Sequence, residues 1–218
     1  MGMIILLNGV SSAGKSSIAK ALQGIWPTPL LELGIDRFIS MMPRKYIGLG
    51  PEAQQGFQYV SDRDELGPIV HVKSGWLGHK LLLSIPSIIY SLTQHGYDLV
   101  VDEVIEGDER LWNYVQLLNN HRVYFIAVVC NIDTLEERER ARQNRPVGMA
   151  RPQSKIVHGP TRVYDFEIDT TFVSPDTSAQ QILDFITQNP KPQAFKKLKM
   201  LRDGKQSQSP NSVVNTIW

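Results

Sequence analysis

The residues best suited to chemistry lie near the start of the chain, in a segment rich in glycine and serine. Residues 9–16 are Gly-Val-Ser-Ser-Ala-Gly-Lys-Ser and match the pattern G-x-x-x-x-G-K-[ST] at every fixed position. Glycines let such a loop curl so that successive backbone N–H groups point at phosphate oxygens. Lys15 then reaches the β- and γ-phosphates, and the Ser16 hydroxyl can hold Mg²⁺. We expect ATP with Mg²⁺ to be bound here by Gly9, Val10, Ser11, Ser12, Ala13, Gly14, Lys15, Ser16 and Ser17.

The elements on either side of this loop are those that the pattern requires. Residues 3–8 form a continuous apolar run, which is typical of a parallel strand buried on both faces. Residues 16–25 predict a helix that ends before Trp26-Pro27, and its positive N-terminal end adds to the attraction for phosphate. Because a strand, the loop and a helix follow one another in the order that the pattern requires, a chance match is improbable. The pattern does not show whether the γ-phosphate is transferred, hydrolysed or only bound.

A carboxylate follows the second predicted strand. Residues 30–35 form this strand, and Asp36 comes directly after it. Ligands bind at the carboxyl ends of parallel strands, so Asp36 should face the same crevice as the phosphate loop. There it could accept a proton from an acceptor hydroxyl as the γ-phosphoryl group departs. The alternative is that Asp36 caps a short helix over residues 37–42, and the two roles are compatible.

Two further acids follow the third predicted strand, residues 97–101. Asp102 at the end of this apolar strand would hold Mg²⁺ through a water molecule, opposite Ser16. Its neighbour Glu103 could contact the acceptor instead. The alternative for both is an ordinary strand-end acid in a solvated loop.

Three arginines follow the fourth predicted strand at helical spacing. Arg138, Arg142 and Arg145 are separated by four and three residues, so a helix over residues 134–142 and its continuation would present them on one face. Such a face could close over ATP, stack on adenine and neutralise charge on the transferring group. We therefore count Arg138 and Arg142 with Asp36 and Lys15 as catalytic candidates. The alternative is a solvated helix stabilised by ion pairs such as Glu136 with Arg140.

Alternating strands and helices along the chain predict an α/β fold of the P-loop nucleotide-kinase type. Its parallel five-stranded sheet would be flanked by helices and covered by a helical lid at about residues 131–152. Residues 1–189 would form this domain, and residues 190–218 a basic, flexible tail. The alternatives for this tail are a contact with a partner and a helix packed on the body. The other expected elements are helices over 67–95, 109–119 and 178–188, strands over 123–130 and 166–169, and an irregular segment over 43–65.

Composition excludes several classes of function. The 218 residues carry a formal net charge of +1, too little to clamp a nucleic-acid backbone, so no nucleic-acid partner is expected. The single cysteine, Cys130, excludes an internal disulfide and fits a reducing compartment. The longest apolar stretch, residues 81–92, is broken by Pro86 and by serines, so it cannot span a bilayer. We expect a soluble cytoplasmic protein with no membrane partner.

Several of these motifs together resemble the chloramphenicol phosphotransferases and similar P-loop small-molecule kinases. The resemblance covers residues 3–188 and rests on residues 8–16, on Gly34-Ile35-Asp36, on Gly67-Pro68 at the start of a matching long helix, on Val101-Asp102-Glu103, and on Arg138, Arg142 and Arg145. It implies ATP-dependent phosphorylation of a hydroxyl, with Asp36 as the general base. Residues 44–66, Glu103 in place of an aspartate, and the basic tail depart from the family pattern.

The leading interpretation is therefore an ATP-dependent O-phosphotransferase that uses Mg²⁺. Its acceptor would be a hydroxyl of a small molecule, either chloramphenicol or a related antibiotic or metabolite, which would link it to antibiotic resistance. One alternative is a toxin-like P-loop kinase acting on a nucleotide sugar. Another is a nucleotide-binding switch without turnover. The sequence fixes neither the natural acceptor nor the oligomeric state.

Overall fold

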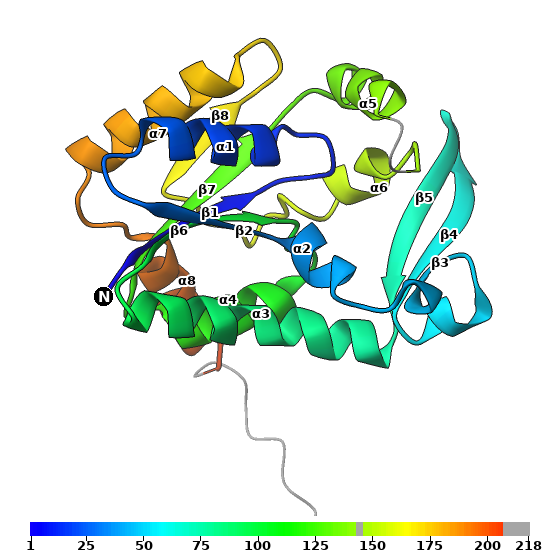
Figure 1. Ribbon diagram of the computed structural model, residues 1–218, viewed down its shortest axis with the longest axis horizontal. Helices are drawn as coiled ribbons and strands as arrows, with labels where there is room; N and C mark the ends of the chain where they lie inside the picture. Colours follow the sequence, from blue (N-terminus) through cyan, green and yellow to red (C-terminus); the bar gives the residue numbers. More distant parts are fainter. Residues whose placement is uncertain (143–145, 207–218) are drawn as a thin grey trace, which may run out of the picture.

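The computed structural model describes residues 1–142 and 146–206, and a five-stranded parallel sheet lies at its centre (Figure 1). Its strands are β1 (Met3–Asn8), β2 (Leu30–Gly34), β6 (Asp98–Glu103), β7 (Arg122–Val129) and β8 (Phe166–Asp169), in the order β2-β6-β1-β7-β8. All the neighbouring strands of this sheet run parallel. The predicted α/β class and its five-stranded parallel sheet are thus confirmed.

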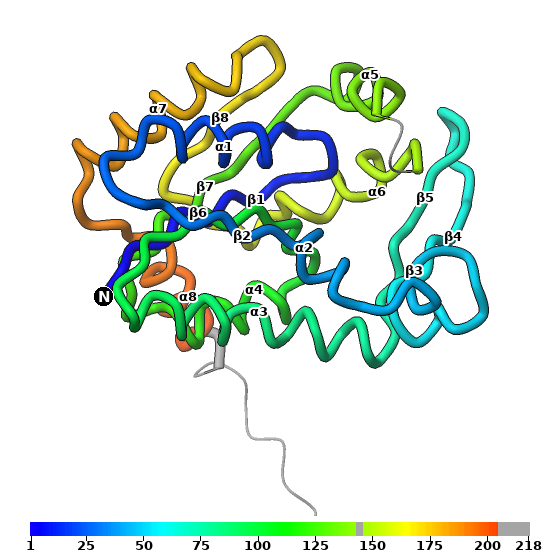
Figure 2. Tube along the Cα trace, viewed as in Figure 1, coloured from blue at the N-terminus to red at the C-terminus, as the bar shows by residue number. Residues whose placement is uncertain are grey.

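Helices cover both faces of this sheet, which explains why its central strands are apolar throughout (Figure 2). Helices α1 (Lys15–Ile25) and α7 (Pro175–Gln188) pack on one face, and α3 (Trp76–Gln94), α4 (Asp108–Leu118) and α8 (Ala194–Gln206) on the other. Successive residues of β1 alternate between two cores: Ile5 and Leu7 belong to the α1 side, Ile4 and Leu6 to the α3 side. All four are fully buried.

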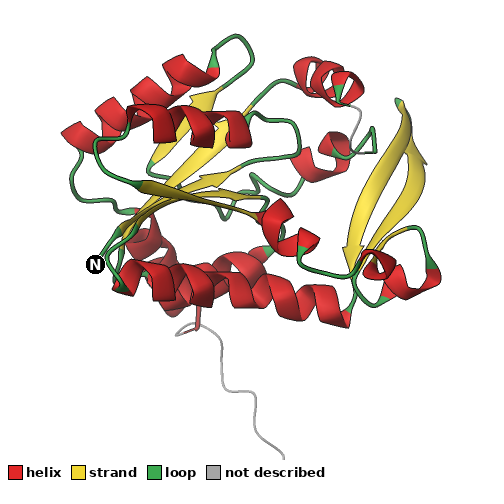
Figure 3. Ribbon diagram, viewed as in Figure 1, coloured by secondary structure: helices red, strands yellow, loops and turns green. Residues whose placement is uncertain are grey.

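A second, smaller sheet corrects the prediction for residues 43–75 (Figure 3). Strands β3 (Ile47–Gly48), β4 (Phe57–Asp64) and β5 (Gly67–Ser74) form it, with β4 and β5 as an antiparallel hairpin. The helix expected from Gly67 begins only at Trp76. Gly67 has a φ of +127°, which suits the hairpin turn and which no helix residue adopts. Gly67-Pro68 therefore opens a strand, and the expected helix start, including its match to the family pattern, was wrong.

Short helices line the carboxyl edge of the main sheet and the segment that leads to the hairpin. They are α2 (Ile35–Ser40), α5 (Ile132–Ala141), α6 (Ala150–Ser154) and the 3₁₀ turns η1 (Arg44–Tyr46) and η2 (Pro51–Gln54). Asn131 caps α5, since its side chain accepts a hydrogen bond of 2.8 Å from the Thr134 amide. No helix among residues 1–142 and 146–206 is long and apolar enough to cross a membrane.

The start of the basic segment is a packed helix and not a flexible tail. In α8, Ala194, Phe195 and Leu198 are buried in the core on the α3 side. The Phe195 ring meets that of Phe125 edge to face at 5.5 Å. An Asp165 carboxylate oxygen accepts hydrogen bonds from the Gln193 and Ala194 amides. Apolar residues on one face of the helix and lysines on the other explain why it packs. Residues 207–218 of the expected tail lie outside the described residues.

Replacing Phe195 with alanine should lower the free energy of unfolding by about 3 kcal/mol, because it leaves a cavity between α8 and the sheet. Urea denaturation followed by circular dichroism measures this change. Lys196→Ala on the exposed side of α8 is the control and should change it by less than about 0.5 kcal/mol. Equal stability of the two variants would mean that α8 does not pack on the domain.

Candidate functional site

The predicted phosphate loop lies between β1 and α1, at the carboxyl edge of the sheet. Gly14 has a φ of +90° and Ser12 a φ of +62°, so the chain turns through two left-handed residues before α1 begins at Lys15. The Ala13 amide donates a hydrogen bond of 3.3 Å to the Val10 carbonyl and closes the turn. A β-carbon at Gly9 would collide with the Val128 carbonyl of β7, so only glycine fits at the start of the loop.

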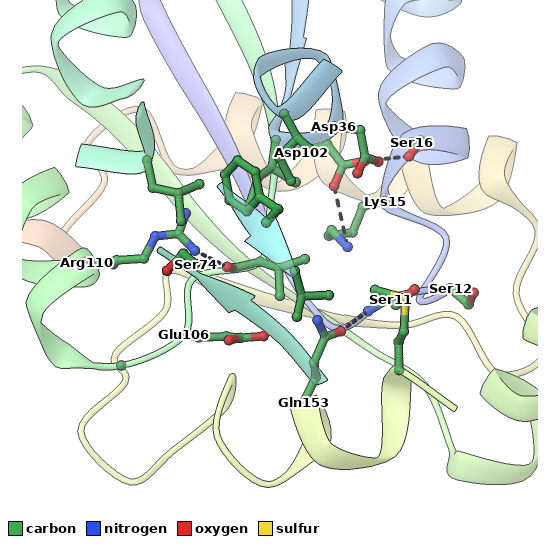
Figure 4. Close-up of a pocket in the computed structure, with 18 of the residues that line it drawn as sticks. Ser11, Ser12, Lys15, Ser16, Asp36, Ser74, Asp102, Glu106, Arg110 and Gln153 are labelled. Carbon is green, nitrogen blue, oxygen red and sulfur yellow. Dashed lines mark hydrogen bonds and ion pairs between the residues drawn. The ribbon is translucent and has the colours of Figure 1, made fainter. Parts of the chain in front are cut away.

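Lys15 and Ser16 both contact Asp102 at the end of β6 (Figure 4). The buried Lys15 Nζ lies 3.4 Å from Asp102 Oδ1 and donates a 2.9 Å hydrogen bond to the Val10 carbonyl. The Ser16 hydroxyl donates to Asp102 Oδ2. A hydroxyl and a carboxylate side by side, next to a phosphate loop, are the hard oxygen ligands that Mg²⁺ takes. This donor set therefore fits the predicted metal.

Asp36 lines the same cavity as these residues, from the first turn of α2. Gly34, two residues earlier, pairs in register with Asp102 on the neighbouring strand. This register brings Asp36 beside Asp102 and Ser16 (Figure 4). Gly34 and not Asp36 is the N-cap of α2, so the capping alternative for Asp36 does not hold.

Glu103 faces away from the cavity, contrary to the suggestion that it contacts the acceptor. It is fully buried, with Oε2 2.9 Å from the Arg110 guanidinium and Oε1 accepting a 2.6 Å hydrogen bond from the Tyr114 hydroxyl. Burial, and then the charge of Glu103, raise the pKa of Tyr114 well above its ordinary value, so the phenol keeps its proton and donates. Glu103 therefore holds Arg110, which itself lines the cavity.

Arg138 and Arg142, which were expected on one face of a helix, lie in different environments. Arg138 is fixed against the phosphate loop: its guanidinium donates to the Thr170 carbonyl at 2.6 Å and to the Thr170 hydroxyl at 3.1 Å, and lies 3.5 Å from the Ser12 carbonyl. Arg142, just after α5, lines the cavity. Arg145 lies outside the described residues. The ion pair of Arg140 with Glu136, 3.5 Å long, forms as expected.

The cavity encloses about 320 Å³ and extends from the phosphate loop to the β4–β5 hairpin. Of the expected nucleotide contacts it is lined by Ser11, Ser12, Gly14, Lys15 and Ser16, whereas Gly9, Val10 and Ala13 are buried beneath the loop and Ser17 is exposed on α1 outside the lining. Sequence reasoning missed its far end, which includes Ser74, His79, Glu106, Arg110 and Gln153. Glu106 follows a strand end and could have been suspected on that ground. Gln153 gave no signal.

The predicted lid segment is attached to the hairpin. The largely buried Arg151 of α6 lies 2.6 Å from Asp64 and 2.8 Å from Glu136, and it donates a 2.8 Å hydrogen bond to the Pro68 carbonyl. The Gly148 carbonyl accepts a 3.0 Å hydrogen bond from the Val70 amide of β5. Movement of α5 and α6 would therefore carry the hairpin, and with it one wall of the cavity.

Comparison with known proteins places the chain in a family. Residues 2–187 match the family model described as chloramphenicol phosphotransferase-like protein. The chain belongs to this family. Two Mycobacterium tuberculosis proteins named "Putative O-phosphotransferase" are each 28% identical to it over 199 residues, which cover 91% of this chain and 88% of theirs.

Solved structures share the fold of this phosphotransferase-like chain at low sequence identity. The M. tuberculosis APS kinase, solved in complex with AMPPNP and APS, has a TM-score of 0.58 at 16% identity, covering 85% of this chain and 98% of its own. A sugar kinase from Janibacter has a TM-score of 0.57 at 15% identity, covering 86% and 95%. The fold is thus that of P-loop kinases. Together with the family, it identifies the chain as an ATP-dependent phosphotransferase.

Proposed function

We propose that the protein transfers the γ-phosphate of ATP to a hydroxyl of a small molecule, with chloramphenicol as the first candidate. The observation that carries the proposal is the position of Asp36 in one cavity with Lys15, Ser16 and Asp102. A carboxylate in this position would accept the proton of an acceptor hydroxyl, next to the groups that would hold the phosphates. Phosphorylation of chloramphenicol would make antibiotic resistance the biological role. Cytoplasmic ATP would supply the phosphate.

Each residue of the site has a specific role in the proposed phosphoryl transfer. The loop amides and Lys15 bind the phosphates, and Arg138 and Arg142 steady charge on the transferring group from the lid side. Asp36 accepts the hydroxyl proton while the acceptor oxygen bonds to the γ-phosphorus and the bond to the β–γ bridging oxygen breaks, which releases ADP. Ser16 and Asp102 would hold Mg²⁺, which neutralises phosphate charge when bound. The residues would thus catalyse the transfer by positioning the two substrates and by stabilising the charge on the transferred group.

ADP release in the presence of Mg²⁺, measured with and without chloramphenicol, tests the proposal. We expect ADP to form only slowly with ATP alone and many times faster when an acceptor is added. The product should carry one phosphate by mass spectrometry. If chloramphenicol has no effect, hydroxylated metabolites are screened in the same assay. An ADP release rate that no hydroxyl compound changes would refute the kinase function and favour a nucleotide-binding switch.

A further inference from the structure

The buried Gln153 of α6 lies between the phosphate loop and the far end of the cavity, which it helps to line. Its Oε1 accepts a 2.7 Å hydrogen bond from the Ser11 amide of the phosphate loop (Figure 4). Its side chain also hydrogen-bonds Glu106, which points into the cavity from the loop between β6 and α4. One side chain therefore joins the phosphate loop to the far end of the cavity.

The carboxamide of Gln153 has the chemistry that these two contacts require. The Ser11 N–H is a donor, so the carboxamide turns its oxygen toward it, and this leaves the NH₂ group for the carboxylate of Glu106. A glutamate at this position would repel Glu106, and an apolar side chain would leave the buried Ser11 amide without this acceptor. The residue type thus fits a bridge between a backbone donor and a carboxylate.

The backbone that carries Gln153 is anchored on both sides. The buried carboxylate of Glu139 accepts hydrogen bonds of 2.9 Å from the amides of Gly148 and Ala150, which ties the start of α6 to α5. After α6, the fully buried Val157 donates its amide to the Gln153 carbonyl at 2.9 Å. Because the side chain starts from an anchored backbone, its two hydrogen bonds set the distance between the phosphate loop and Glu106.

A second tie, deeper in the fold, holds the same loop of residues 104–107. Asn8 is fully buried at the end of β1, directly before the phosphate loop, and its Oδ1 accepts a 2.8 Å hydrogen bond from the Ile105 amide. The backbone of the loop is therefore fixed by Asn8, and the side chain of Glu106 by Gln153. Both ties lead to the segment that would hold the phosphates.

The γ-phosphate would lie at the Lys15 and Ser16 end of the cavity, which leaves the end with Glu106, the acceptor end, for the second substrate. We infer that Gln153 is a positioning residue: it holds the acceptor end at a fixed distance from the phosphate loop, so that the acceptor hydroxyl meets the γ-phosphorus in preference to water. The inference rests on the proposed function and adds to it a residue that acts through Glu106. A displacement of about 1 Å between reacting groups can lower a rate about a hundredfold.

The amount of phosphorylated acceptor formed per ADP released tests the inference. Water that attacks in place of the hydroxyl gives ADP and inorganic phosphate, so the ratio compares the two reactions. A loss of folded enzyme lowers both products together and leaves the ratio unchanged. The acceptor is chloramphenicol or, if it has no effect, the hydroxyl compound that most stimulates wild-type ADP release.

We expect a ratio near one for the wild type. Gln153→Met, which keeps a similar volume and removes both hydrogen bonds, should lower kcat for transfer about tenfold and the ratio at least about threefold. Gln181→Met makes the same substitution at an exposed position of α7 outside the cavity and should keep the wild-type ratio. Glu106→Ala should lower the ratio as Gln153→Met does, and the double variant should lower it no further, because Gln153 acts through Glu106.

Calorimetric titration with AMPPNP and Mg²⁺ shows whether Gln153 serves nucleotide binding instead, and Gln153→Met should bind AMPPNP about as tightly as the wild type. A wild-type ratio in Gln153→Met, additive losses in the double variant, or a loss of AMPPNP affinity as large as the loss of rate would overturn the inference while the proposed function stands. If no hydroxyl compound stimulates wild-type ADP release, the proposed function is refuted and the inference fails with it.

Discussion

Replacing Asp36 with asparagine is expected to lower acceptor-dependent ADP release by a factor of about one hundred or more. Asparagine has nearly the same shape as aspartate and keeps a polar group in the first turn of α2, but it cannot accept the hydroxyl proton. Lys15 and Ser16, the residues proposed to hold the phosphates and Mg²⁺, come from a different element, α1, and are unchanged. The loss should therefore appear in kcat, with the affinity for AMPPNP close to that of the wild type.

Asp176→Asn is a matched control for this variant. Asp176 is an exposed acid in the first turn of α7, as Asp36 is in the first turn of α2, so both substitutions remove the same interaction with a helix N-terminus. Only Asp36→Asn should slow the transfer. If the two variants had equal rates, or if Asp36→Asn lost nucleotide affinity in proportion to its rate, Asp36 would not be the base.

Sequence could predict the parts of the fold that depend on local pattern and on burial. Strands covered on both faces must be apolar throughout, which allowed strands to be predicted over residues 3–8 and 123–130. The phosphate loop is a local structure whose spacing alone specifies it. Since parallel strands end at one edge, the order of the elements also predicted that Asp36 and Asp102 would meet there, and the register of β2 with β6 brings them together.

The acceptor end could not be predicted, because its residues meet only through tertiary structure. The hairpin pairs mostly with itself and is half exposed, so its apolar pattern is weak, and Gly67-Pro68 suits the start of either a helix or a strand. Glu106 and Gln153 lie far apart in sequence, and they line one cavity from the loop between β6 and α4 and from α6. The suggestion that Glu103 contacts the acceptor could have been rejected from the sequence. Successive strand residues face opposite sides of a sheet, so Asp102 and Glu103 could not share one cavity.

Replacing Lys15 with methionine is expected to lower acceptor-dependent ADP release by a factor of about one thousand. Methionine keeps most of the length of the side chain, so the buried space that Lys15 fills next to Val10 and Asp102 stays occupied. What is lost is the ammonium charge, which would balance the β- and γ-phosphates in the ground state and the charge that spreads over the γ-phosphoryl oxygens during transfer. ATP affinity should therefore fall as well as kcat, which distinguishes this variant from Asp36→Asn.

Lys20→Met provides the comparison, since Lys20 is exposed on the same helix α1 and its substitution removes the same charge from the chain. Its rate and its affinity for AMPPNP should stay at the wild-type level. Thermal unfolding of Lys15→Met without nucleotide checks that the variant folds, because Asp102 loses its cationic neighbour but keeps the Ser16 hydroxyl. A folded Lys15→Met protein with wild-type turnover would mean that the loop does not bind the transferred phosphate. The roles proposed for Asp36 and Asp102 would then also be wrong, because both depend on the phosphate lying at this loop.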